Sequence, residues 1–364
     1  MNSKLTQLLL LLLLLTGCKS DDKETATPEP TMLSIYVYSP EHPVATRTES
    51  SATDAENAVH TIQLWVFRQD TQALVAYLNP DAETLNSGGA TYEVPVDDNF
   101  AITKPPVNVY VLINGAAAGA ALTQTSTQTQ VEAAVISGNE ATGYSPASLQ
   151  TAVSSTLGLP MSGVLKSQPI VDSRPVLRIG TEDQIARVRV ARAVSKVQFA
   201  FARPVGSTEV KITSITMNDA IPQQTYLLPT APYDGTTASI PTGATYDAVT
   251  LPGLESITVH DNPSSIQLME GDELEEAVAQ QTSKLGPYYL RESDKKITGT
   301  IKYKVGTDAE KTANFAMADA GGFSRNHSWV VYAYYSGSDQ ELKVMTLQVR
   351  NWNDSEKEYE IYNW

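Results

Sequence analysis

The stretch MLSIYVYSPEHPVATRTE, residues 32–49, decides how this chain folds. Leu33, Ile35 and Val37 alternate with polar or aromatic residues, which is the period-two pattern of a β-strand with one buried face. Two prolines and a run of small polar residues follow, and a lone arginine, Arg47, lies within this run. Such a loop is expected to be exposed. The sequence therefore predicts a core strand that is joined to its neighbour by a loop that a trypsin-like protease can cut.

The first 17 residues have the features of a secretory signal. Lys4 precedes an unbroken run of leucines from Leu8 to Leu15, which is too short to span a bilayer as a helix. The run ends in Leu-Thr-Gly-Cys, which resembles a bacterial lipobox with Cys18 as the lipidated residue. We expect residues 1–17 to be removed and the acidic, proline-containing residues 18–30 to be a tether to the outer membrane.

The composition is that of a folded, acidic protein. Hydrophobic residues make up 41% of the chain, charged residues make up 18%, and the formal net charge is −15. Such a chain can bury enough apolar surface to fold, and it lacks the basic stripe that binding to nucleic acid requires. Cys18 is the only cysteine, which excludes an intrachain disulfide and a cysteine-rich zinc site.

Short segments with alternating apolar residues recur along the chain. The clearest are residues 59–67 and 107–114, together with a long strand-like segment at residues 186–202. Many short strands with few helices predict an all-β fold built of β-sandwiches.

The length of the chain suits two such domains. We expect one sandwich over residues 31–188 and a second over residues 189–364, with the seam in the strand-like segment between them. Two short helices are predicted, one at residues 145–158 and one at residues 270–284, because turn and capping residues flank them.

The sequence carries no signature of catalysis. The four histidines lie far apart, without the HExxH or H-x-E spacing of metal hydrolases, and no GxSxG serine or GxxxxGK[ST] loop occurs. Acidic residues 272–276 can in principle supply paired carboxylates for glycoside hydrolysis, but such a row is more typical of a solvated helix face. We therefore expect neither an enzyme nor a bound metal or cofactor.

Four short motifs occur in an order that is known from one protein family. They are LPMSG at 159–163, RAVSKVQF at 192–199, YYLRE at 288–292 and RNHSW at 325–329, the last followed by a strand pair that ends in V-x-x-W. This order resembles fimbrillins, the type V pilins of Bacteroidetes. The lipobox, with an arginine roughly thirty residues after the lipidated cysteine, is similar to the precursor layout of their major subunit.

The resemblance implies two transthyretin-like β-sandwiches in tandem and export to the cell surface as an outer-membrane lipoprotein. It also implies trimming by an arginine-specific protease, which maps here to the Arg47–Thr48 bond, with loss of the strand that carries Leu33, Ile35 and Val37. A strand of another fimbrial subunit then fills the vacated position by β-augmentation. The expected function is a structural subunit of an adhesive surface fimbria.

Two C-terminal segments are candidates for the donor strand. The sequence leaves open which of them is the donor, and whether both are ordinary edge strands of the second sandwich. One segment has alternating apolar residues opposite Glu358 and Glu360, and the other has a run of alternating apolar residues. Their apolar residues are Tyr359 and Ile361 in the first, and Met345, Leu347 and Val349 in the second.

A glycan-binding surface lipoprotein is the rival function. Trp65, Trp329, Trp352 and Trp364, with 17 tyrosines, can stack on sugars at a polar surface. Their core-like spacing on strands nevertheless favours cross-strand packing.

Overall fold

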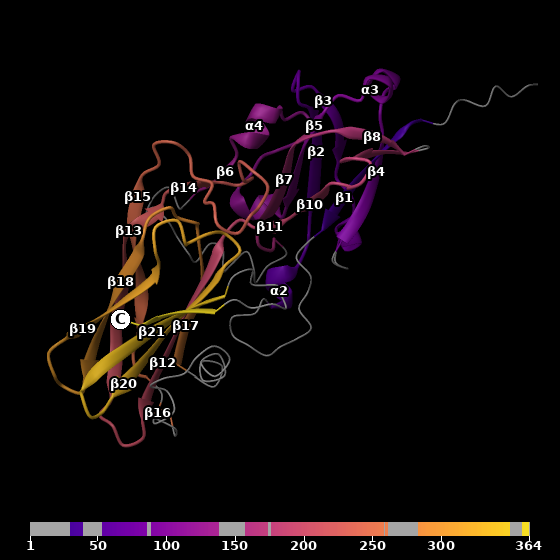
Figure 1. The fold of residues 1–364 in the computed structure, drawn as a ribbon. Coiled ribbons are helices and arrows are strands. Elements are labelled where there is room, and N and C mark those ends of the chain that lie inside the picture. Colours follow the sequence, from indigo (N-terminus) through magenta and orange to yellow (C-terminus); the bar gives the residue numbers. More distant parts are fainter. Residues whose placement is uncertain are drawn as a thin grey trace, which may run out of the picture.

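The computed structural model of the chain describes residues 30–38, 53–85, 89–137, 157–173, 176–257, 259–260, 283–349 and 359–363. These residues form two β-sandwiches that lie at the two ends of an elongated molecule (Figure 1). The predicted all-β fold is therefore confirmed. The helices predicted at 145–158 and 270–284 lie mostly outside the described residues, and the described ends of these two segments are not helical.

The first sandwich consists of two five-stranded sheets whose inner faces share one core. One sheet contains β4 (Gly89–Pro95), β1 (Met32–Tyr38), β9 (Val176–Ile179), β10 (Arg187–Arg189) and β8 (Ile170–Ser173). The other has the order β11 (Ala191–Arg192), β7 (Met161–Gln168), β5 (Val107–Ile113), β2 (Ile62–Arg68) and β3 (Leu74–Leu78).

Strand β5 is buried on both faces. Val107, Val109 and Val111 lie in the core between the two sheets. On the opposite face, Tyr110 and Leu112 lie in a second cluster of buried side chains. That cluster includes residues of α4 (Gln128–Glu132) and of the second half of the chain, which cover the outer side of the sheet.

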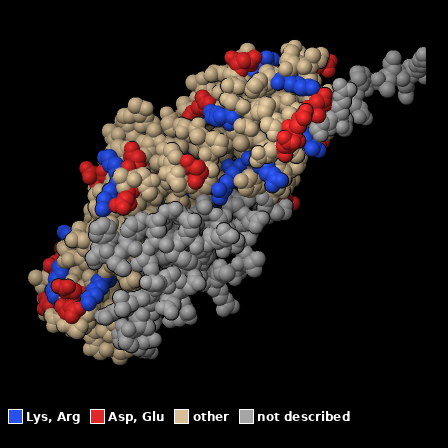
Figure 2. All heavy atoms as spheres, in the orientation of Figure 1, with Lys and Arg blue, Asp and Glu red and all other residues tan. Residues whose placement is uncertain are grey.

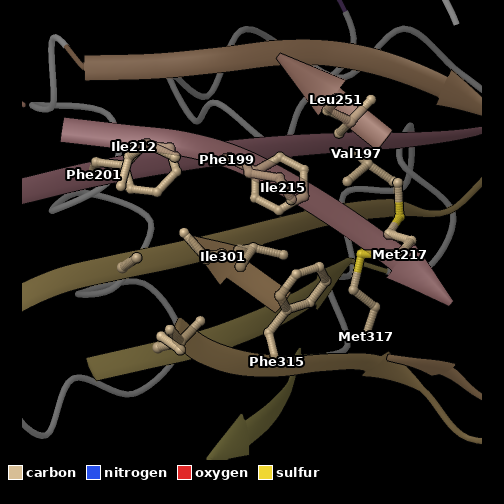
Figure 3. Close-up of a cluster of buried hydrophobic side chains, with 14 of the residues drawn as sticks. Val197, Phe199, Phe201, Ile212, Ile215, Met217, Leu251, Ile301, Phe315 and Met317 are labelled. Atoms are coloured by element: carbon tan, nitrogen blue, oxygen red, sulfur yellow. The ribbon is translucent and has the colours of Figure 1, made fainter. Parts of the chain in front are cut away.

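The second sandwich is built in the same way. One sheet contains β16 (Val259–His260), β17 (Ser283–Leu290), β12 (Ser195–Pro204), β20 (Ser328–Ser336), β21 (Glu341–Val349) and β22 (Tyr359–Asn363). The other has the order β15 (Tyr246–Leu254), β13 (Val210–Pro222), β18 (Ile297–Val305) and β19 (Lys311–Ala318). Val197, Phe199 and Phe201 of β12 lie in the core between these sheets, as their alternation predicts (Figure 3).

A β-bulge in β13 explains an irregular spacing in the sequence. Ile212 and Ile215 are both buried in the core although they are three residues apart, a spacing that breaks the period of a regular strand. The pairing with β18 shifts register between Ile212 and Ser214. The extra residue lets both isoleucines point to the same face.

The chain passes from the sheets of the first sandwich to those of the second within residues 186–202. Residues 186–202 form three strands rather than one, because β10 and β11 pair with the first sandwich and β12 with the second. The change of sheet therefore falls between Arg192 and Ser195, shortly after the expected boundary at residues 188 and 189. A small sheet of β6 (Val135–Ser137) and β14 (Gln224–Tyr226) also joins the two halves.

Short helices connect some of the strands. They are α2 (Asp54–Asn57), α3 (Asp98–Thr103), α4 and the 3-10 turns η1 (Ala82–Leu85) and η2 (Gly115–Ala118). None of the helices in the described ranges has the length and apolar character that a membrane span requires.

Candidate functional site

Strand β1 lies inside its sheet rather than at an edge. On one side it pairs antiparallel with β4 along its whole length, from Met32 opposite Pro95 to Tyr38 opposite Gly89. On the other side it pairs in parallel with β9 through its first half and with β10 through its second half. We call the position between β4 and these two strands the β1 slot. Emptying this slot would expose unpaired edges on β4, β9 and β10.

The inner face of β1 is part of the core of the first sandwich. Leu33, Ile35 and Val37 are 0%, 1% and 0% exposed, and they belong to the cluster that contains the inner residues of β2 and β5. Burying three aliphatic side chains of this size contributes about 5–9 kcal/mol. The segment is therefore held mainly by packing, in addition to its two ladders of hydrogen bonds.

The outer face of β1 is partly covered by its neighbours. The rings of Tyr36 and Tyr38 are stacked with their centroids 6.3 Å apart, and the guanidinium of Arg187 lies 5.1 Å from the centroid of the Tyr36 ring. A Cβ atom at Gly89 would lie 2.6 Å from the hydroxyl of Tyr36. Glycine at this place on β4 therefore makes room for the tyrosine.

The predicted processing sites lie outside the described residues. These are the lipidation site Cys18 and the scissile bond between Arg47 and Thr48, so both stay predictions. The chain becomes described again at Thr53, where a capping box begins α2: the Thr53 side chain accepts from the backbone of Glu56, and the Glu56 carboxylate accepts from the amide of Thr53 at 2.7 Å. Helix α2, which follows the predicted cut, therefore has a capped N-terminus.

Glu56 connects this helix to the seam between the sandwiches. Its carboxylate is fully buried, with Nζ of Lys196 at 3.1 Å and the hydroxyl of Tyr289 at 2.7 Å. The guanidinium of Arg192 donates to the backbone oxygen of Glu56 and to the side chains of Asn57 and Asn326. A helix of the first half is therefore fixed to β12 and β17 of the second.

Opposing effects set the pKa of the Glu56 carboxylate. Burial alone would raise the pKa of Glu56, but Lys196, the hydrogen bonds from Thr53 and Tyr289, and Arg192 together hold it below its ordinary value. Burial lowers the pKa of Arg192 to about 10, although Glu56 acts in the opposite direction. Burial and the neighbouring Glu56 carboxylate raise the pKa of the Tyr289 phenol. The cluster therefore holds an ionised carboxylate between cations at neutral pH.

A second buried ion pair lies at the same seam. The guanidinium of Arg325 donates to the Glu292 carboxylate, with distances of 3.0 Å and 2.5 Å, and both residues are at most 1% exposed. The same guanidinium reaches the Ser162 hydroxyl at 3.3 Å and the backbone oxygen of Leu227 at 3.2 Å. The pair therefore connects the second sandwich to β7 of the first.

The four motifs that resemble fimbrillins meet at this seam. LPMSG supplies Ser162, RAVSKVQF supplies Arg192 and Lys196, YYLRE supplies a tyrosine and Glu292, and RNHSW supplies Arg325 and the asparagine after it. Asn326 has a left-handed backbone with φ of 61°, which asparagine tolerates better than most residues. The motifs therefore set how the two sandwiches join.

Sequence reasoning missed Glu56. The available signal was the Thr-x-x-Glu spacing of a capping box at residues 53–56. That signal predicts the start of a helix. It does not predict that the Glu56 carboxylate contacts buried residues more than a hundred positions away in the sequence.

The two donor candidates occupy different positions in their sheet. β21 lies between β20 and β22, and it pairs with β20 through nine residues, from Glu341 to Val349. Among the strands that the structure describes, β22 pairs with β21 alone and ends the order of this sheet, with Leu347 opposite Ile361 and Val349 opposite Tyr359. β22 can therefore leave by breaking one ladder, whereas removal of β21 breaks two. Whether either strand is donated stays a prediction.

The residues considered for metal or sugar binding do not form such a site where they are described. His327 is buried directly before β20, and the described ranges contain no group of three or more His, Cys, Asp or Glu residues suited to a metal ion. Trp65 and Trp329 are fully buried, so neither ring is available to stack on a sugar. Trp352 and Trp364 lie outside the described residues.

Comparison with solved structures identifies the fold. A crystal structure named "putative cell adhesion protein", from Parabacteroides distasonis, superimposes with a TM-score of 0.51 at 12% identity, over 92% of this chain and 96% of that one. The two chains share one fold.

Two further structures align over a similar length. One is a fimbrial assembly protein from Parabacteroides distasonis, with a TM-score of 0.47 at 12% identity, over 92% of this chain and 100% of that one. The other is the tip fimbrial protein Mfa3 from Porphyromonas gingivalis with a C-terminal truncation, with a TM-score of 0.43 at 13% identity, over 92% and 99%. No family model matches the chain, and no curated protein matches it in sequence.

Proposed function

We propose that this chain is a structural subunit of a surface fimbria. In this proposal it is exported as a lipoprotein anchored through Cys18, cut after Arg47, and polymerised when a strand of another subunit fills the β1 slot. The shared fold with a protein named for cell adhesion supports an adhesive surface role, as does the resemblance of the motifs.

The observation that carries the proposal is the position of β1. A strand with neighbours on both sides and three fully buried aliphatic residues is an integral part of its sandwich. The same strand is the first described element, and the segment between it and α2 contains Arg47. One cut would thus leave β1 attached by non-covalent contacts alone.

The energetics favour replacement of β1 over an empty slot. An empty slot would lose the apolar burial that contributes about 5–9 kcal/mol. It would also expose the edges of three strands, which proteins normally avoid. A donated strand with alternate apolar residues restores both contributions. An assembled fibre would consequently come apart slowly.

Limited trypsin treatment of the purified precursor tests this function. The expected result is a new N-terminus at Thr48, followed by a ladder of oligomers that resists SDS. The matched control is Arg47→Gln, which should keep β1 attached to the rest of the chain and stay monomeric under the same treatment. Trimming without any ladder, or a ladder in the uncut Arg47→Gln variant, would overturn the proposal.

A further inference from the structure

Three arginines lie in a row beside the outer face of the β1 slot. Arg178 of β9 is in register with Ser34, Arg187 of β10 with Tyr36, and Arg189 of β10 with Tyr38. Because cross-strand partners share a face, these arginines line the outer side of the slot. We call Arg178, Arg187 and Arg189 the arginine row. Figure 2 shows basic side chains gathered over the region where Figure 1 places β10, on a chain with a net charge of −15.

Strand β1 gives the arginine row no carboxylate. Its sequence, MLSIYVY, contains no charged residue. Arg178 and Arg187 are exposed, and neither forms an ion pair within the described part of the chain. Arg187 lies over the Tyr36 ring, and Arg189 lies 5.1 Å from the centroid of the Tyr233 ring of the second sandwich.

Among the described residues, the arginine row outnumbers the carboxylates beside the outer side of the slot. On the β4 side, Glu93 lies opposite Ser34, and it is the charged residue that β4 contributes to this face. On the far side of β9, Asp172 of β8 is held by Lys104 at 3.0 Å. A strand with carboxylates at its outward positions would therefore fit the arginine row better than β1 does.

The C-terminal strand of this same sequence has that pattern. Residues 358–362 read Glu-Tyr-Glu-Ile-Tyr, so Glu358 and Glu360 alternate with Tyr359 and Ile361. When the latter two fill adjacent inner positions of the slot, Glu360 falls between them, at the position of Ser34 or of Tyr36. This holds for both strand directions and for every such register, because side chains alternate with a period of two. At the position of Tyr36, Glu360 lies beside Arg187 and Thr91, and at the position of Ser34 it lies between Arg178 and Glu93. The register with Glu360 at the position of Tyr36 is therefore the one that the charges favour.

The other donor candidate lacks this match. Between Met345, Leu347 and Val349 lie Thr346 and Gln348, which carry no charge. We propose that the arginine row selects the acidic face of residues 358–362 of a second copy of this chain as the occupant of the β1 slot. This inference rests on the proposed fimbrial function, and it decides between the two donors that the sequence leaves open.

Assembly kinetics of the trimmed chain test the selection. The variant is Arg178→Glu/Arg187→Glu. The matched control is Lys211→Glu/Lys304→Glu, which reverses the charge of two lysines that lie opposite each other on β13 and β18 of the second sandwich. Charges at the rim of an interface act mainly on the association rate. We expect the arginine variant to form the ladder about tenfold more slowly at low salt, with most of the difference lost at 1 M salt, where the Debye length is about 3 Å. The control should assemble like the original chain.

Reciprocal changes identify the partner. Glu358→Arg/Glu360→Arg alone should slow assembly to a similar degree, which also provides a test if the arginine variant fails to fold. Combined with the arginine reversals, it should restore the rate. Equal rates for all these chains would overturn the selection while leaving the fimbrial function intact. Slowing without rescue would overturn residues 358–362 as the occupant, and failure of the unaltered trimmed chain to polymerise would overturn both proposals.

Discussion

Replacing Glu56 by glutamine should weaken the seam between the two sandwiches. The change keeps the shape of the side chain but removes the charge that faces Lys196 at 3.1 Å and lies near Arg192. Both cations are buried, at 3% and 1% exposure. Both would then lose the negative charge of Glu56 in a region from which water is largely excluded.

The cost follows from the burial of the pair. Removing one partner of a buried ion pair typically destabilises a protein by about 3–5 kcal/mol, because the remaining charge stays uncompensated. For a domain of this size, that loss corresponds to a decrease in Tm of roughly 10 °C. Replacing both partners, as in Glu56→Gln/Lys196→Met, should cost less than the sum of the two single changes.

Thermal unfolding followed by circular dichroism measures this effect, and hydrogen exchange at α2 shows whether the loss is local. The matched control is Glu310→Gln, which alters an exposed pair with Lys302 at 3.6 Å and should change the Tm little. Equal Tm values for Glu56→Gln and Glu310→Gln would refute the reasoning. Strictly additive losses in the double variant would refute the coupling between Glu56 and Lys196.

Three other predictions concern pH, the first strand and one glycine. The pKa of Glu56 in the folded protein lies below its ordinary value of 4.5. Its contribution to stability is therefore present above pH 4.5 and is lost as the pH falls through the folded pKa. Urea unfolding between pH 6 and pH 3 should show this loss of stability, and the Glu56→Gln variant should lack it. Ile35→Ala should destabilise the precursor by about 2–5 kcal/mol yet leave the trimmed, assembled protein unchanged in Tm, since the residue is then absent; an equal change in both would argue that β1 stays bound. Gly163→Ala should cost about 1–3 kcal/mol in urea unfolding, because its Cβ would lie 2.2 Å from the backbone oxygen of Arg189, and a variant as stable as the original would show that this contact relaxes freely.

The strands with regular alternation could be predicted from the sequence. Leu33, Ile35 and Val37 alternate without interruption, and the structure buries all three. The spacing of Ile212 and Ile215 does not reveal its bulge, because the register shift depends on pairing with β18. Burial of Tyr110 on the second face of β5 depends on α4 and on residues from the other half of the chain, which no local pattern contains.

The seam was the part that the sequence indicated but could not explain. The motifs around Arg192, Glu292 and Arg325 pointed to a family resemblance, while their shared location depends on contacts across long sequence separations. Charged residues within strand-like segments are a usable signal, since a charge that is buried in a sheet needs a partner. Glu56, which is that partner for Lys196, lies in a four-residue helix with no apolar period of its own.

The identity of the strand between β4 and β9 in an assembled fibre tests the central proposal most directly. Cryo-electron microscopy of fibres grown from the trimmed chain can resolve the side chains in that position. We predict a strand from a neighbouring subunit, with Tyr359 and Ile361 pointing into the core in place of two residues of β1. Finding Met32–Tyr38 still in its slot, with subunits joined through some other surface, would contradict it.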